Sequence, residues 1–162
     1  MFSGCTALKY PPSLQSNTVN SSGCAYMFAG CPIITAPAIT ITTISDNCFE
    51  DMFQSCQKIQ RCYLNFNPIA TYSCQEMFKD CSKLSSLVVK FDTWGNNTDT
   101  RNWVQNVAIN GTFYCSTDLD TTLKGVDYIP AGWTIENNNK TSKLVFKDTI
   151  SVGDMTIFYL TK

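Results

Sequence analysis

The chain has 162 residues and a formal net charge of −1. Its 12 basic and 13 acidic residues leave no positive excess to hold a phosphate backbone, which argues against nucleic-acid binding. Histidine is absent, so the commonest general base, the commonest metal ligand and histidine-assisted nucleophiles are excluded. No apolar run reaches the ~18 residues of a membrane-spanning helix.

The motif Met-Phe-x-x-Cys occurs four times along the first half of the chain, beginning at Met1, Met27, Met52 and Met77. Each copy has an aliphatic residue three positions after the cysteine, and three copies have a further cysteine upstream. A unit of about 25 residues cannot bury its own apolar side, so repeated units stack and share one continuous core.

Two periodicities follow one another within each unit. Methionine, cysteine and the aliphatic residue are spaced i, i+4 and i+7, as in Met1, Cys5 and Leu8. This spacing predicts a short helical turn with those residues on its inner side. The prediction extends to the equivalent residues of the later units.

The residues after each motif alternate with a period of two, which predicts a strand with one inward face. The expected inward residues are Pro37, Ile39 and Ile41 in the second unit, Cys62, Leu64 and Phe66 in the third, and Leu87, Val89 and Phe91 in the fourth. Because proline cannot donate to a ladder, Pro11, Pro12 and Pro37 predict short or irregular strands in the first two units.

Strand, loop and helical turn in repetition predict a mainly β fold with short helical turns, a leucine-rich-repeat-like solenoid with a parallel sheet on one side. The segment CAYMFAGCPIITAPAITITTISDNC (24–48) resembles the BspA-type leucine-rich repeats that are common in surface proteins of Bacteroides and its relatives, and related repeats occur in phages. The resemblance covers residues 1 to about 91 and continues in 102–115 and 129–137. It implies adhesion or surface recognition without catalytic residues.

The chain departs from this pattern at its start, since Met1 is already the repeat methionine and no signal peptide is visible. We expect either a mature or excised segment, or a protein that is not exported by the signal-peptide route. The N-terminal end of the stack is then bare, covered by a partner or continued in a longer chain.

Composition divides the chain into three predicted regions: the repeats over 1–92, an irregular C-terminal cap over 93–137, and a terminal β-hairpin over 138–162. The hairpin would pair the runs 143–147 and 155–160, with a turn signal at 152–154. Scattered large residues in the middle region are typical of a cap over the end of the stack. An alternative is an aromatic ligand cleft formed by Trp94, Trp103 and Trp133.

Nine cysteines invite a chemical interpretation, but their spacing favours a structural one. Within a unit the pairs are too far apart to ligate one zinc ion together, and matched positions predict a buried column of soft side chains. Disulfides, metal binding or catalysis are the alternatives. The acidic pairs Glu50–Asp51 and Asp118–Asp120 are interpreted as solvated loop charges. We predict no catalytic residue, cofactor or metal site.

The solvent side of the predicted sheet is the candidate binding face. Its expected contact residues are Tyr10, Arg61, Tyr63, Asn65 and Lys90, with Ser86 and Val88 between them.

We expect a non-enzymatic recognition or adhesion module, extracellular or at a cell surface, with a protein or glycan as partner. The alternative is a phage virion component, such as a fibre or decoration protein, which would contact virion neighbours or itself. Cysteines kept as free thiols favour the virion hypothesis, because phage proteins assemble in a reducing cytoplasm. An enzyme such as a glycosidase is the third hypothesis.

Overall fold

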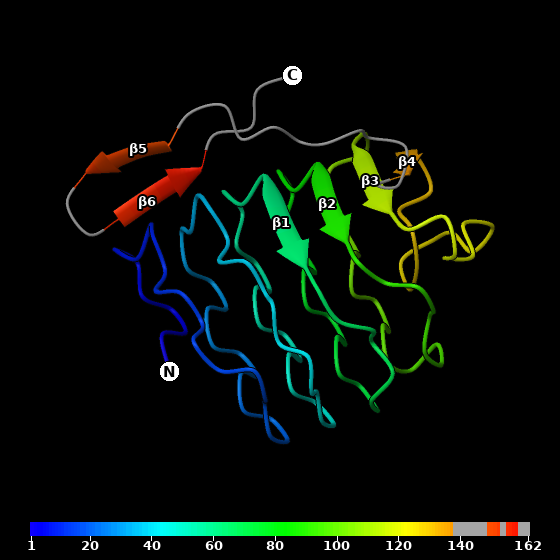
Figure 1. Cartoon of the computed structure of the whole chain (residues 1–162), viewed down its shortest axis with the longest axis horizontal. Coiled ribbons are helices and arrows are strands. Elements are labelled where there is room, and N and C mark those ends of the chain that lie inside the picture. The colour runs from blue at the N-terminus through cyan, green and yellow to red at the C-terminus, as the bar shows by residue number, and fades with distance from the viewer. Residues whose placement is uncertain (138–148, 153–154, 159–162) are drawn as a thin grey trace.

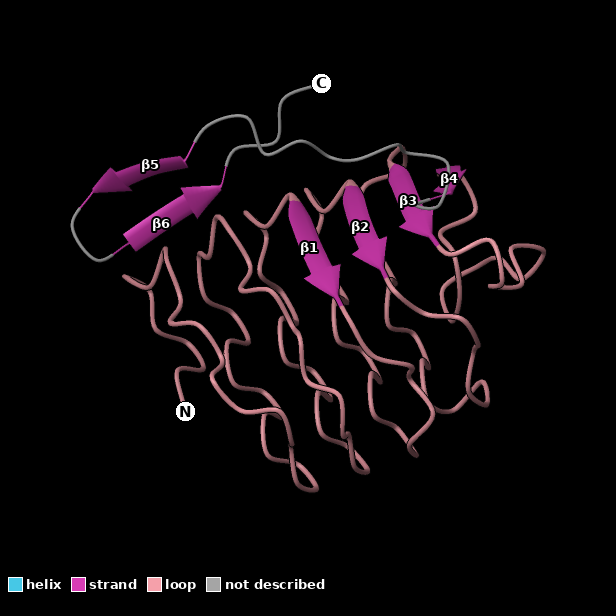
Figure 2. Ribbon diagram, in the orientation of Figure 1, coloured by secondary structure: helices cyan, strands magenta, loops and turns pink. Residues whose placement is uncertain are grey.

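The computed structural model describes residues 1–137, 149–152 and 155–158, the last two ranges by their backbone. The chain is mainly β, and no helix is found in the described part (Figure 2). A parallel sheet contains β1 (Arg61–Leu64), β2 (Ser86–Val89), β3 (Thr112–Cys115) and β4 (Thr134–Asn137), in that order. The repeating units lie side by side in chain order behind it (Figure 1).

The predicted alternation of the strands is confirmed. In β2, Leu87 and Val89 are completely buried, whereas Ser86 and Val88 are partly exposed. Leu87 is in register with Cys62 of β1 and with Phe113 of β3, so each inward row continues from strand to strand. These rows form one wall of the core.

The first two units form no regular strand, as their prolines predict. Only isolated parallel bridges occur there, between Thr18 and Thr43 and between Ile39 and Leu64. Ile39 and Ile41 are nevertheless buried, and Ile39 N donates to Tyr63 O at 2.9 Å. The chain therefore follows the direction of the sheet at these units without completing its ladder.

The predicted helical turn at the motif is wrong. Residues 46–55 and 71–80 form consecutive turns in which every fourth residue has a positive φ. Within these two segments the positions are Asn47, Asp51, Ser55, Tyr72, Glu76 and Asp80. Such left-handed residues end an α-helix before it completes its hydrogen bonds.

Hydrogen bonding between units explains this conformation. Backbone N–H groups alternate: Phe53 N donates to Met77 O of the next unit at 2.9 Å, whereas Cys56 N donates back to Phe53 O at 3.0 Å. An α-helix would use all these donors internally and leave none for the neighbouring unit. The inward burial predicted for the motif is confirmed for Met52, Cys56 and Ile59, although the local backbone differs. It is wrong for the first unit, where Met1 is 89% exposed and Cys5 is exposed.

The sheet continues beyond the last motif. Strands β3 and β4 lie within 93–137, the segment expected to form an irregular cap, and β3 pairs with β2 in the same parallel sense. Hydrogen bonds also join the rest of this segment to itself: Asp127 Oδ1 accepts from Asn102 N at 2.6 Å, and Val126 O accepts from Val104 N at 3.2 Å. The division of the chain at residue 92 stays a prediction, and the sheet crosses it.

A separate antiparallel pair joins β5 (Thr149–Val152) to β6 (Met155–Phe158), with Val152 opposite Met155. The turn signal predicted at 152–154 thus falls between two paired strands. The predicted partner of the run 155–160 is wrong, because Met155–Phe158 pairs with Thr149–Val152 of the expected connecting segment. The run 143–147 lies outside the described residues. Since the described part has no long apolar helix, it contains no candidate membrane-spanning helix.

Candidate functional site

The candidate site is the outer face of the parallel sheet, formed by the side chains of β1–β4 that point away from the core. Parallel pairing aligns them in two rows that run across the strands. The first row is Arg61, Ser86, Thr112 and Thr134, and the second is Tyr63, Val88, Tyr114 and Glu136. We call this set the outer face.

The second row places an apolar side chain between two tyrosines. Tyr63, Val88 and Tyr114 are all half-buried, in register, on three neighbouring strands. Strands in a sheet lie about 4.8 Å apart, so the backbones that bear the two tyrosines are separated by roughly 10 Å. The row is a shallow contact strip with an apolar centre and phenolic hydroxyls at its sides.

A groove of about 370 Å³ opens where β1 and β2 begin. It is lined by Ile34, Thr35, Gln60, Arg61, Ser85 and Ser86. Within it, Arg61 Nε donates to Ser86 Oγ at 3.2 Å, which links the first two members of the first row. The groove and the tyrosine row are therefore adjacent parts of one surface.

The sequence-predicted contact residues do not all meet. Arg61 and Tyr63 lie on β1, and Asn65 and Lys90 follow β1 and β2 directly on the same side. Tyr10 is 72% exposed, but the first unit has no strand, so Tyr10 joins no row of the sheet. That these residues bind a ligand stays a prediction.

Sequence reasoning missed the contributions of β3 and β4 to the outer face. The segment Thr112–Cys115 alternates, with Phe113 and Cys115 buried and Thr112 and Tyr114 outward. This period of two was visible in the sequence, but it was overlooked because no Met-Phe-x-x-Cys motif precedes it.

The motif cysteines have a specific structural role. Three of the four donate their thiol to the carbonyl of the motif phenylalanine in the preceding unit, with Sγ–O distances of 2.9 Å for Cys31 to Phe2, 3.0 Å for Cys56 to Phe28 and 3.0 Å for Cys81 to Phe53. That carbonyl also accepts a backbone N–H from its own unit, so both of its lone pairs are used. The predicted buried column is confirmed for these residues.

Burial makes the inward-facing thiols unreactive. Desolvation raises the pKa of Cys56 and of Cys62 to about 12 and that of Cys48 to about 11, so these thiols stay protonated near neutral pH. All nine cysteines lie in the described part and are free thiols, and only Cys5 is exposed. Nucleophilic chemistry needs an accessible thiolate, which the buried thiols do not offer.

The upstream cysteines do not all occupy matched positions. Cys24 N donates to Cys48 O and Phe49 N donates to Ser73 O, so Phe49 aligns with Cys24 and with Cys74. Cys48 precedes that position by one residue because its unit has one extra residue before the methionine. It is nevertheless completely buried.

The aromatic-cleft alternative is wrong for two of its three tryptophans. Trp103 is completely buried, and Trp133 is 4% exposed. Their indole N–H groups donate to Tyr128 O at 2.8 Å and Ala108 O at 2.7 Å, and Trp94 Nε1 donates to Asp120 O at 2.9 Å. The tryptophans pack in the C-terminal units and link their segments by these hydrogen bonds. They do not line an aromatic cleft.

One acidic prediction is also wrong. Asp51 is 4% exposed rather than solvated, and it accepts from Gln54 Nε2. Desolvation raises the pKa of Asp51, and its hydrogen bond with Tyr26 raises the pKa of Tyr26 to about 12. Asp118 and Asp120 are exposed, as expected.

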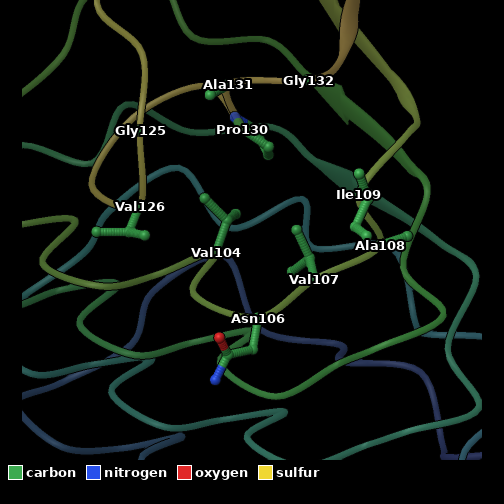
Figure 3. Close-up of a pocket in the computed structure, with 10 residues that line it drawn as sticks. All are labelled: Val104, Asn106, Val107, Ala108, Ile109, Gly125, Val126, Pro130, Ala131 and Gly132. Atoms are coloured by element: carbon green, nitrogen blue, oxygen red, sulfur yellow. The ribbon is translucent and has the colours of Figure 1, made fainter.

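An apolar pocket of about 280 Å³ lies at the other end of the sheet (Figure 3). Val104, Val107 and Val126 point into it, and Ile109 at its rim is 85% exposed. It offers contact area but no charged group. Among the described residues, no cluster of three or more acidic or cysteine side chains could hold a metal ion.

Comparison of the sequence with protein-family models and with curated proteins, and of the structure with solved structures, gives no match. The functional interpretation therefore depends on the outer face itself.

Proposed function

We propose that this chain is a leucine-rich-repeat-like solenoid that acts as a non-enzymatic recognition module. Its outer face would bind a protein or a glycan at a cell surface. The observation that supports this most is the in-register row Tyr63–Val88–Tyr114 beside the Arg61–Ser86 pair. Tyrosine and arginine are the residue types that most often dominate binding energy at interfaces.

The sheet is suited to this role because its outer side chains do not form part of the hydrophobic core. The core lies on the opposite side, where Leu64, Leu87 and Phe113 are completely buried. Outer-face residues can therefore vary with the ligand while the scaffold persists, as is usual for repeat proteins with extended binding surfaces.

The test is binding of the purified chain to arrays of glycans and extracellular-matrix proteins. A bound probe is then measured against Tyr63→Ala and Tyr114→Ala, which should each weaken binding by about tenfold or more if these tyrosines are central contacts. Tyr72→Ala is the matched control, because Tyr72 is half-buried like Tyr63 and Tyr114 but belongs to the turn segment 71–80 outside the sheet. No binding across both arrays would contradict the proposal.

The alternative, a virion component with the same fold, is supported by the thiols. Eight buried free cysteines suit a chain that folds in a reducing cytoplasm. Light scattering of the purified chain separates the two proposals: a virion component should assemble into defined oligomers, whereas a recognition module has no such requirement.

A further inference from the structure

The groove at the start of β1 and β2 has the chemistry of an anion site. Arg61 is its only charged residue, among side chains that are otherwise amide, hydroxyl or aliphatic. Within the part of the chain that the structure describes, the single ion pair joins Lys79 to Glu76, so no described carboxylate neutralises Arg61. An arginine without an acidic partner in a hollow is available to a ligand.

The guanidinium is also oriented. Because Arg61 Nε donates to Ser86 Oγ at 3.2 Å, its two terminal NH₂ groups remain as a planar pair of donors. This fork matches the two oxygens of a carboxylate and binds them in bidentate fashion. Resting on the proposed function, we infer that the groove binds the carboxylate of an acidic glycan, such as one bearing a uronic or sialic acid.

The surroundings favour a glycan over an acidic peptide. Thr35, Gln60 and Ser85 supply hydroxyl and amide groups that complement sugar hydroxyls. An extended peptide would instead need main-chain N–H and C=O groups that are free to pair with its own. In the groove, the N–H groups of Ser85 and Ser86 are already committed, because both donate to Gln60 O at 3.1 Å.

Neighbouring residues set the direction in which the glycan would extend. Tyr63 lies two residues after Arg61 on the same side of β1, roughly 7 Å away along the strand. Its ring offers an amphipathic surface to the next sugar. Lys90 adds positive charge on the same half of the face, whereas Glu136 on β4 repels an acidic chain from the far half.

The experiment uses the full chain on an array of uronic- and sialic-terminated oligosaccharides, each beside its carboxyl-reduced counterpart, with acidic peptides as a separate arm. We expect the acidic glycans to bind and their reduced forms to bind about tenfold more weakly. Arg61→Gln should lose about tenfold or more, and Ser86→Ala a few-fold because it releases the guanidinium.

The chain's other arginine provides a matched control. Arg101→Gln removes the same charge from an exposed turn residue outside the groove and should change affinity less than twofold, about the size of a long-range charge effect. Equal binding of reduced glycans, preference for acidic peptides, or an unchanged Arg61→Gln variant would overturn the inference. Silence of the acidic glycans would overturn the inference. If neutral glycans or proteins on the wider arrays then bind and lose affinity with Tyr63→Ala, the proposed function is supported; silence on those arrays as well would contradict both.

Discussion

The motif units and the C-terminal units share one sheet but are held together by different side chains. Between motif units, the thiols of Cys56 and Cys81 donate to main-chain carbonyls of the preceding unit. In the C-terminal units, where the motif is missing, the indoles of Trp103 and Trp133 donate to carbonyls of neighbouring segments. In both regions a buried side-chain donor reaches a main-chain carbonyl of another segment, and thiol and indole groups both serve as that donor.

Aromatic packing shows the same contrast. Phe28, Phe53 and Phe78 stack nearly parallel, with centroid distances of 5.6 and 5.5 Å and interplanar angles of 13° and 4°. Beyond Phe78 the next ring, Trp103, is tilted by 59° at 6.1 Å. Units that share the motif phenylalanine permit the same ring stacking. The regular stack of rings ends at the first unit that lacks this residue.

The largest predicted effect is a loss of folding stability at alkaline pH, caused by buried thiols of the motif units. In the unfolded chain these thiols ionise near 9.0, whereas burial raises the pKa of Cys48 to about 11 and of Cys56 and Cys62 to about 12. Because the unfolded state releases its protons first, stability is full below pH 9 and is lost as the pH rises toward 12. At about 1.4 kcal/mol per thiol per pH unit, these three cost about 4 kcal/mol at pH 10.

Denaturant unfolding at pH 8, 9 and 10 under reducing conditions measures this loss. The double variant Cys56→Ala and Cys62→Ala should show a shallower decline than the parent chain. An identical pH dependence in the two proteins would show that these buried thiols do not control alkaline stability.

A second comparison uses two glycines, one from each region. A methyl group at Gly111 would lie 2.5 Å from Ser85 O and 2.6 Å from Trp133 Cε2, so Gly111→Ala should destabilise the chain by about 3 kcal/mol or more. At Gly30 the nearest atom is Gly4 Cα at 4.0 Å, and only the φ of +71° opposes a side chain. Gly30→Ala should therefore cost only about 1 kcal/mol. Equal losses in denaturant unfolding would contradict the close packing at Gly111.

The smallest effect distinguishes the two kinds of donor. Trp103→Phe removes the indole donor from Tyr128 O and should cost about 2 kcal/mol. Cys81→Ala should cost about 1 kcal/mol, because the Phe53 carbonyl keeps its bond from Cys56 N. A larger loss for Cys81→Ala in chemical denaturation would mean that the thiol contributes more than a weak, second donor.

Much of the inner side of the strands was predictable, and so was part of the outer face. The alternation around Leu64 and Leu87 indicated which side chains are buried, because side chains of a strand point to opposite faces. Tyr114 and Glu136 were missed, because their strands follow no motif. The groove at Arg61 was not predictable, since it requires residues of three units to be placed together.

The sequence by itself determined the repeat length, the buried positions of the third and fourth units and the irregular first two strands, since these depend on spacing and on proline chemistry within one unit. Tertiary structure decided the rest. The spacing i, i+4, i+7 is helical in isolation, yet residues 46–55 turn with a left-handed residue at every fourth position. They do so because half of their N–H groups donate to main-chain carbonyls of the next unit. A single unit does not contain those acceptors.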